Sequence, residues 1–164
     1  MKFPPCEVPA PAVAMVVALS VAACGGRTHR APGAEGAPAV EAAMRRYAML
    51  LRGAPPDSVA AAYAEAGELV LPGVGTLHGR AAIRDFLAPL AAAVEVTAVD
   101  VATDSLTVHG AGAEQWGTYR QVAGERGKAP GVYRGHYAAR WQRDADGRWR
   151  LSRLVMQPLP ADAR

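Results

Sequence analysis

The fold of this protein is decided where its residue pattern changes, within IRDFLAPLAAAVEVTAVDVATDSLTV, residues 83–108. Apolar side chains recur at Ile83, Phe86, Leu87 and Leu90, which is the spacing of one face of a helix. From Val94 onward the pattern changes to β-branched and alternating residues, which is typical of strands. We therefore predict a helix over about 80–93 that leads directly into strand structure.

Upstream of this stretch, the sequence predicts two further helices. Apolar residues at helical spacing indicate an amphipathic helix over 39–52. A second helix is expected from about residue 57 to Gly67, with Tyr63 facing inward, because glycine commonly ends helices. A short strand over 68–71 follows it.

Downstream, three longer strands are predicted at about 114–123, 131–143 and 148–158, separated by turns rich in Gly, Pro and Asp. Helices thus come first and a meander of antiparallel strands comes last. This order predicts an α+β domain, with three N-terminal helices packed on a curled antiparallel sheet in a cone-shaped barrel.

The amino terminus has the features of an export signal. A positive residue, Lys2, precedes the apolar stretch 10–23, which is too short to span a membrane. The string LSVAAC, ending at Cys24, resembles a bacterial lipobox, in which the cysteine carries the lipid. We expect residues 1–23 to be a signal peptide, 24–38 a flexible tether and 39–160 the folded domain. Ordinary cleavage after Ala23, or an uncut segment, are the alternatives.

The lipobox resemblance also implies a location. Gly25 follows the cysteine, where enterobacterial lipoproteins retained in the inner membrane carry aspartate. We expect the protein to be lipid-anchored in the cell envelope, at the outer membrane and facing the periplasm.

Composition excludes several kinds of chemistry. Both cysteines, Cys6 and Cys24, precede the domain, so the domain has no disulfide, thiolate nucleophile or cysteine-ligated zinc. The histidines are not at metal-ligand spacing, and we expect neither a metal nor a cofactor. A net charge of +3 is too small to indicate nucleic acid, which we do not expect as a partner.

Two stretches carry a resemblance to a known family: YAEAGELVLPGVGTLHGRAAIRDF, residues 63–86, and YAARWQRDADGRWRL, residues 137–151. Together they resemble SnoaL-like and ketosteroid-isomerase-like members of the nuclear transport factor 2-like superfamily, over about 39–158. The resemblance implies a curled sheet wrapped around helices, with an apolar pocket at its wide end.

The same resemblance assigns roles that can be checked. Ketosteroid isomerases use a carboxylate base, a tyrosine and a protonated aspartate. Tyr47 falls at the position of the tyrosine, but Leu71 occupies that of the base, and 133–141 contains no Asp or Glu for the third role. Glu68 cannot replace the base, because strand alternation points it away from Leu71. Isomerase chemistry is therefore not expected.

The expected pocket residues are mostly aromatic, with Arg120 beside them: Tyr47, Leu71, Trp116, Tyr119, Tyr137, Trp141 and Met156. They could equally form only the core between helices and sheet. His78 could act as an acid or base if it faces the pocket, and is otherwise a turn residue. His136 lies on the surface if the aromatic face of its strand lines the cone, and lines a polar cavity with Arg140 if the faces are reversed.

Two functions follow. The first is a membrane-anchored lipoprotein that binds a small apolar ligand or an envelope partner without isomerase activity. The alternative is a SnoaL-like isomerase, cyclase or dehydratase acting on a polyketide- or steroid-like substrate, with Tyr47 and His78 as catalytic candidates. A homodimer and weak attraction to anionic head groups stay open.

Overall fold

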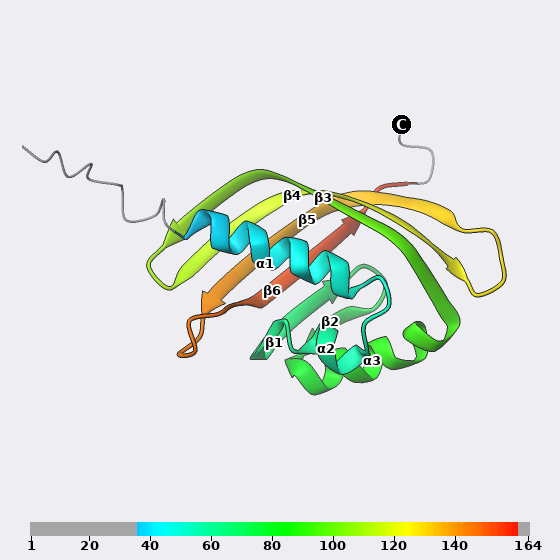
Figure 1. The fold of residues 1–164 in the computed structure, drawn as a ribbon, viewed down its shortest axis with the longest axis horizontal. Coiled ribbons are helices and arrows are strands. Elements are labelled where there is room, and N and C mark those ends of the chain that lie inside the picture. The colour runs from blue at the N-terminus through cyan, green and yellow to red at the C-terminus, as the bar shows by residue number, and fades with distance from the viewer. Residues whose placement is uncertain (1–35, 161–164) are drawn as a thin grey trace, which may run out of the picture.

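The computed structural model describes residues 36–160, which form an α+β fold with a curled sheet (Figure 1). The helices are α1 (Ala37–Leu50), α2 (Pro56–Ala60) and α3 (Gly79–Ala93), and the strands are β1 (Tyr63–Leu71), β2 (Gly75–His78), β3 (Val94–His109), β4 (Gly112–Glu125), β5 (Gly131–Arg143) and β6 (Trp149–Pro158). The predicted class, helices packed on a curled sheet, is confirmed at this level. The expected signal peptide, Cys24 and most of the tether lie outside the described residues.

The helices cover one face of the sheet at two places. Figure 1 shows α1 crossing the long strands, while α2 and α3 lie beside β1 and β2. Pro38 stands in the first turn of α1, where its missing amide hydrogen costs nothing. The apolar stripe of α1, including Val40, Met44 and Tyr47, is buried and packs into the core. None of the helices within residues 36–160 is long and apolar enough to cross a lipid bilayer.

The second predicted helix is shorter than expected. Only Pro56–Ala60 is helical, and β1 already begins at Tyr63, which was predicted to lie on a helix. Tyr63 pairs with Leu151 of β6, and a register shift follows before Glu68. A Cβ on Gly67 would stand 2.7 Å from the carbonyl oxygen of Leu151, so glycine permits this close approach. Pairing with a distant strand thus overrides the local helical spacing.

The sheet is mixed rather than wholly antiparallel, which corrects the predicted topology. Its strand order is β2-β1-β6-β5-β4-β3, and β1 runs parallel to β6 while the other neighbours are antiparallel. The third helix follows a strand, as the predicted strand over 68–71 and helix over about 80–93 imply, but β2 between them was not predicted. The helices therefore do not all come first along the chain.

The predicted long strands are confirmed, and β3 is more continuous than its broken apolar pattern suggested. It runs over 16 residues, with register shifts against β4 between Val96 and Ala98 and between Thr103 and Ser105. Irregularities of this kind bend and twist a strand. At the second shift a Cβ on Gly117 would stand 2.0 Å from the carbonyl oxygen of Ala102, so only glycine fits there.

Candidate functional site

An open cavity of about 570 Å³ is lined by residues of α1, α2, α3, the loop after α1 and the strands β1, β3, β4 and β6. This volume is within the range that holds small organic ligands, roughly 300–1,000 Å³. Most of its wall is apolar, and the larger apolar side chains are Leu50, Leu51, Val59, Leu69, Leu71, Phe86, Leu87, Leu90, Val94, Val96 and Met156. We call it the cone cavity.

Leu71 lies in the wall of the cone cavity. Leu69, two residues earlier, shares that wall, as strand alternation requires. Glu68 is not among the lining residues. It forms ion pairs with Arg153 of β6 and with His78, whose Nδ1 is 3.2 Å from a carboxylate oxygen of Glu68. The position that the family resemblance assigns to a base is therefore occupied by an alkyl group facing the cavity.

Tyr47 and Tyr63 form a buried hydroxyl pair beside the cavity. Their oxygens are 2.8 Å apart, and their rings meet edge to face with centroids 5.7 Å apart. Tyr47 lines the cone cavity and is 7% exposed, whereas Tyr63 is 0% exposed. Burial raises the pKa of Tyr47 to about 12 and that of Tyr63 well above its usual value. Near neutral pH both hydroxyls therefore keep their protons, and Tyr47 can donate a hydrogen bond to a ligand oxygen but cannot act as a base.

The charged groups in the cavity wall stand near the ends of helices. They are Arg52, after α1, and Glu95 and Arg126, close to the end of α3. The guanidinium of Arg126 donates hydrogen bonds to the carbonyl oxygens of Ala91 and Ala92 in the last turn of α3, where a cation is favourable. Glu95 is exposed and follows Val94, whose side chain is partly buried. The charged groups thus border an apolar interior.

The inner face of the sheet continues the wall beneath α1. Tyr119, Tyr137 and Met156 line a small void of about 30 Å³ that shares Tyr47, Leu51, Gln121 and Met156 with the cone cavity. Trp141 is buried further along β5 and does not line the cone cavity. Of the residues expected around a pocket, the structure therefore brings Tyr47, Leu71 and Met156 to the cone cavity and Tyr119 and Tyr137 to the adjoining void.

Trp116 and Arg120 correct the expectation. Trp116 is 53% exposed, and its neighbour Gln115 faces inward instead, with 2% exposure. Arg120 pairs with Asp100 in an exposed contact on the same face as Trp116. The reason is strand alternation, because Trp116 and Tyr119 are three residues apart and an unbroken strand points them to opposite faces.

The histidine candidates lie away from the cavity. His78 is mostly exposed, pairs with Glu68 and lines neither the cone cavity nor the void beneath α1. His136 is exposed and alternates with the buried Tyr137, so the aromatic face of β5 is the inner one. Arg140 shares the outer face with His136 and pairs with Glu114. Within residues 36–160, no three His, Cys, Asp or Glu side chains gather as metal ligands.

Sequence reasoning missed a buried polar chain that crosses the inner sheet face. The indole of Trp141 donates to the Oε1 of Gln115 at 2.9 Å, and the amide of Gln115 donates to the hydroxyl of Thr103 at 2.8 Å. The hydroxyls of Thr103 and Tyr137 are 3.4 Å apart. The parity of β4, counted from Tyr119, would have placed Gln115 inside. These hydrogen bonds satisfy the buried polar side-chain atoms and hold the aromatic side chains of β5 in place.

Comparison with protein families matches the chain over residues 35–155 to the SnoaL-like domain. Among curated proteins none matches the chain. Solved structures do match in fold. A ketosteroid isomerase-like protein from Erwinia carotovora atroseptica superposes with a TM-score of 0.69 and 16% identity, covering 77% of this chain and 98% of that chain.

Two further structures share the fold. One, from Novosphingobium aromaticivorans, is described provisionally as a scytalone dehydratase, with a TM-score of 0.66, 18% identity, and coverage of 77% of this chain and 85% of that chain. The other is ActVI-ORFA from Streptomyces coelicolor, with a TM-score of 0.63, 19% identity, and coverage of 74% and 96%. At these identities the likeness concerns the fold alone.

Proposed function

This chain belongs to the SnoaL-like domain family, and from that premise we propose that it binds a small apolar molecule in the cone cavity without catalysing isomerisation. The observation that carries the proposal is the wall of the cavity. Leu71 faces it at the position that would need a proton acceptor, and the ionisable groups besides Tyr47 stand at the helix ends. A fold of this kind supports ligand binding or catalysis, so the site must decide between them.

The apolar wall favours an apolar ligand. Burying nonpolar surface contributes about 25 cal/mol per Å², and a polar ligand group without a partner costs free energy in such a cavity. Each hydroxyl has one proton to donate. When Tyr63 donates its proton to the oxygen of Tyr47, the Tyr47 hydroxyl can donate its own to a ligand. The expected ligand is therefore a hydrophobic body with one oxygen near Tyr47.

The proposed lack of isomerase activity is supported by where the possible proton acceptors of this cavity lie. The carboxylate in its wall, Glu95, is an exposed residue just after α3 and not part of the apolar interior. Leu71 cannot accept a proton. The hydroxyl of Tyr47, whose pKa is raised to about 12, keeps its proton near neutral pH. On β5 the inward residues are Gly135, Tyr137, Ala139 and Trp141, so no acid from this strand faces inward. Proton abstraction beside a carbonyl needs a base within hydrogen-bond reach.

The second candidate is catalysis of the kind that relatives' names indicate. The structure named as a scytalone dehydratase and ActVI-ORFA share this fold, and the specific observation in its favour is the Tyr47 hydroxyl beside the cavity. A dehydratase or cyclase could use that hydroxyl as a hydrogen-bond donor to a substrate oxygen. His78 would not take part, because it lies outside.

We also propose that a lipid on Cys24 holds the domain at the envelope, facing the periplasm. This rests on the lipobox-like LSVAAC string at 19–24, which lies outside the described residues. Two acyl chains, at about 0.8 kcal/mol per buried methylene, give stable anchoring. Expressed in a bacterial host, the chain should partition into detergent with a diacylglyceryl mass increment at its new amino terminus. A Cys24→Ala variant should lose both, and an unmodified wild-type chain would refute the anchor.

Ligand binding is tested by filling the cavity. Leu71→Trp adds bulk at the wall, and Val74→Trp is the matched control because Val74 is 51% exposed on the β1–β2 turn and does not line the cavity. Both proteins are melted with a panel of lipophilic metabolites. A ligand at about 100 times its dissociation constant stabilises the fold by about 2.7 kcal/mol, which is several degrees.

The expected result is a ligand that stabilises wild type and Val74→Trp but not Leu71→Trp. No stabilisation of wild type by any member of the panel would count against a small-molecule ligand. Turnover of a panel member that Tyr47→Phe abolishes would favour the catalytic candidate instead. The three outcomes therefore separate the two functions.

A further inference from the structure

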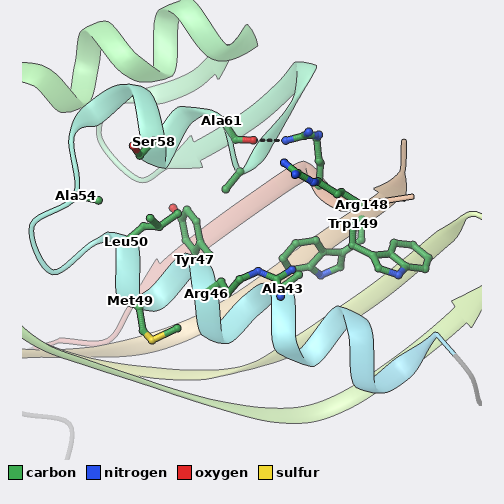
Figure 2. A pocket seen from close by; sticks show the side chains of 13 residues that line it. Ala43, Arg46, Tyr47, Met49, Leu50, Ala54, Ser58, Ala61, Arg148 and Trp149 are labelled. Atoms are coloured by element: carbon green, nitrogen blue, oxygen red, sulfur yellow. Dashed lines mark hydrogen bonds between the residues drawn. The ribbon is translucent and has the colours of Figure 1, made fainter. Parts of the chain in front are cut away.

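A second hollow, of about 410 Å³, lies on the other side of Tyr47 from the cone cavity. It is bounded by α1, by the segment from the α1–α2 loop to the start of β1, and by the β5–β6 turn with the adjoining strands (Figure 2). Tyr47, Leu50 and Ala54 line both hollows and therefore form the wall between them. The SnoaL-like cavity proposed above does not include this space.

The apolar part of the second hollow suits a flat ligand. Trp149 and Trp141 line it with indole rings, and both are buried, at 8% and 3% exposure. Met49 and Leu50 also line it, and the remaining apolar lining residues besides Tyr47 are small: Ala43, Ala54, Ala61 and Ala62. Small residues leave room beside the indoles, and aromatic rings pack favourably against indole faces or edges.

Three guanidinium groups line the same space, from Arg46, Arg148 and Arg150. Figure 2 shows Arg46 extending from α1 and Arg148 from the opposite side, at the turn before β6. Arg150 is committed elsewhere, because it pairs with Asp144 and Asp146 and donates to the carbonyl oxygen of Ala61.

The other two guanidiniums are less committed, since the ion pair of Arg148 is long and its side chain is 75% exposed. Arg148 is 3.7 Å from Asp146, and the amide hydrogen of Arg148 and the guanidinium of Arg150 lower the pKa of that carboxyl. In the part of the chain that the structure describes, no carboxylate lies within ion-pair distance of Arg46. Three cations thus face two carboxylates, Asp144 and Asp146, and the hollow keeps a positive balance.

We propose that this second hollow binds a planar aromatic carboxylate, with its ring beside the indoles and its carboxylate on Arg46 and Arg148. A guanidinium presents paired donors that match the two oxygens of a carboxylate, which gives geometric specificity as well as attraction. A neutral aromatic molecule would satisfy the indoles but leave the arginines without a partner. The charge of the ligand is therefore the feature that separates this site from the cone cavity.

The test uses a pair of probes of nearly the same shape, 2-naphthoate and 2-naphthamide, of which only the first carries a negative charge. The full chain, labelled with ¹⁵N, reports binding through the indole N–H signals of its three tryptophans, assigned by single Trp→Phe variants. Trp116 is the internal control, because it lies exposed on the outer face of the sheet. We expect 2-naphthoate to shift the signals of Trp149 and Trp141 and not that of Trp116, and to bind more tightly than 2-naphthamide.

Arg46→Gln tests the assigned contact, and Arg45→Gln is its matched control, because Arg45 is the adjacent residue of α1, pairs with Glu41 and does not line this hollow. Arg46→Gln should weaken 2-naphthoate binding about fivefold, the effect of a partly exposed charge contact, and leave 2-naphthamide unchanged. Arg45→Gln should change neither. The proposal is overturned if 2-naphthoate leaves Trp149 unshifted, if both probes bind equally, or if the two variants weaken 2-naphthoate alike.

Discussion

The buried pair of Tyr47 and Tyr63 allows a quantitative test of the wall beside the cone cavity. Phenylalanine removes either hydroxyl without changing the ring, so three variants separate the contributions: Tyr47→Phe, Tyr63→Phe and the double variant. The hydroxyl oxygens are 2.8 Å apart, and Tyr63 has no exposed surface. Removing one partner therefore leaves the other in a known environment.

The two single variants should differ in magnitude. Tyr47→Phe leaves the Tyr63 hydroxyl without a hydrogen-bond partner and out of reach of water. An unsatisfied buried hydroxyl lowers the free energy of unfolding by about 1–3 kcal/mol. Tyr63→Phe leaves the Tyr47 hydroxyl beside a cavity that can hold water, so its cost should be near the low end, about 1 kcal/mol. The double variant removes both polar groups and should cost less than the two single changes together, with a coupling of about 1–2 kcal/mol.

Urea unfolding of all four proteins measures these differences, with equal slopes as the condition for comparison. Tyr133→Phe is the control, since Tyr133 is 55% exposed and its change should stay within about 0.5 kcal/mol. Strictly additive single and double changes would refute the hydrogen bond between the hydroxyls. A larger cost for Tyr63→Phe than for Tyr47→Phe would refute the placement of Tyr47 beside the hydrated space.

Three further predictions concern the same wall and sheet. Gln115→Leu should lower the free energy of unfolding by about 1–3 kcal/mol, because the buried Trp141 indole loses its acceptor, and calorimetry should show a lower melting temperature. Gly135→Ala should cost about 1–3 kcal/mol in urea unfolding, since the new Cβ would stand 2.4 Å from the backbone carbonyl oxygen of Gln157 and 2.6 Å from the ring of Tyr119; a neutral result would refute this close packing between β5 and β6. The stability that the tyrosine pair confers should be complete below pH 10 and should fall as pH rises toward 12, because burial raises both pKa values in the folded state. Over that pH range the melting temperature of wild type should therefore fall more steeply than that of the double phenylalanine variant.

Local periodicity predicted those parts of the fold in which one spacing dominates. The third helix and the strands of β5 and β6 were predicted within a few residues, because helical spacing is clear over 83–90, residues alternate along β5, and turn residues precede β6. The helix predicted over 61–67 was wrong. The alanine-rich sequence of this segment suits a helix, but the pairing of Tyr63 with Leu151 decides its structure. No local signal encodes that partner, which lies far away in the sequence.

The cavity residues show the same division. Leu71 was placed in the cavity wall by the family resemblance and by strand alternation, and it lies there. Trp116 was predicted to line the pocket because it is aromatic, although strand alternation places it on the opposite face from Tyr119. It lies on the outer face of the sheet. The second hollow could not be predicted, because Arg46, Trp149 and the Ala61–Ala62 segment meet only after β1 and β6 have paired.

The position of β6 between β1 and β5 has a consequence for how the domain is assembled. The strand that joins the two halves of the sheet is the last one along the described chain, and Glu68 meets Arg153 across 85 residues. Until Trp149–Pro158 has been synthesised, β1 and β2 have no edge to pair with, and α3 covers a hairpin that two strands alone stabilise only marginally. A chain that ends before β6 therefore leaves the β1–β2 hairpin detached from the rest of the sheet.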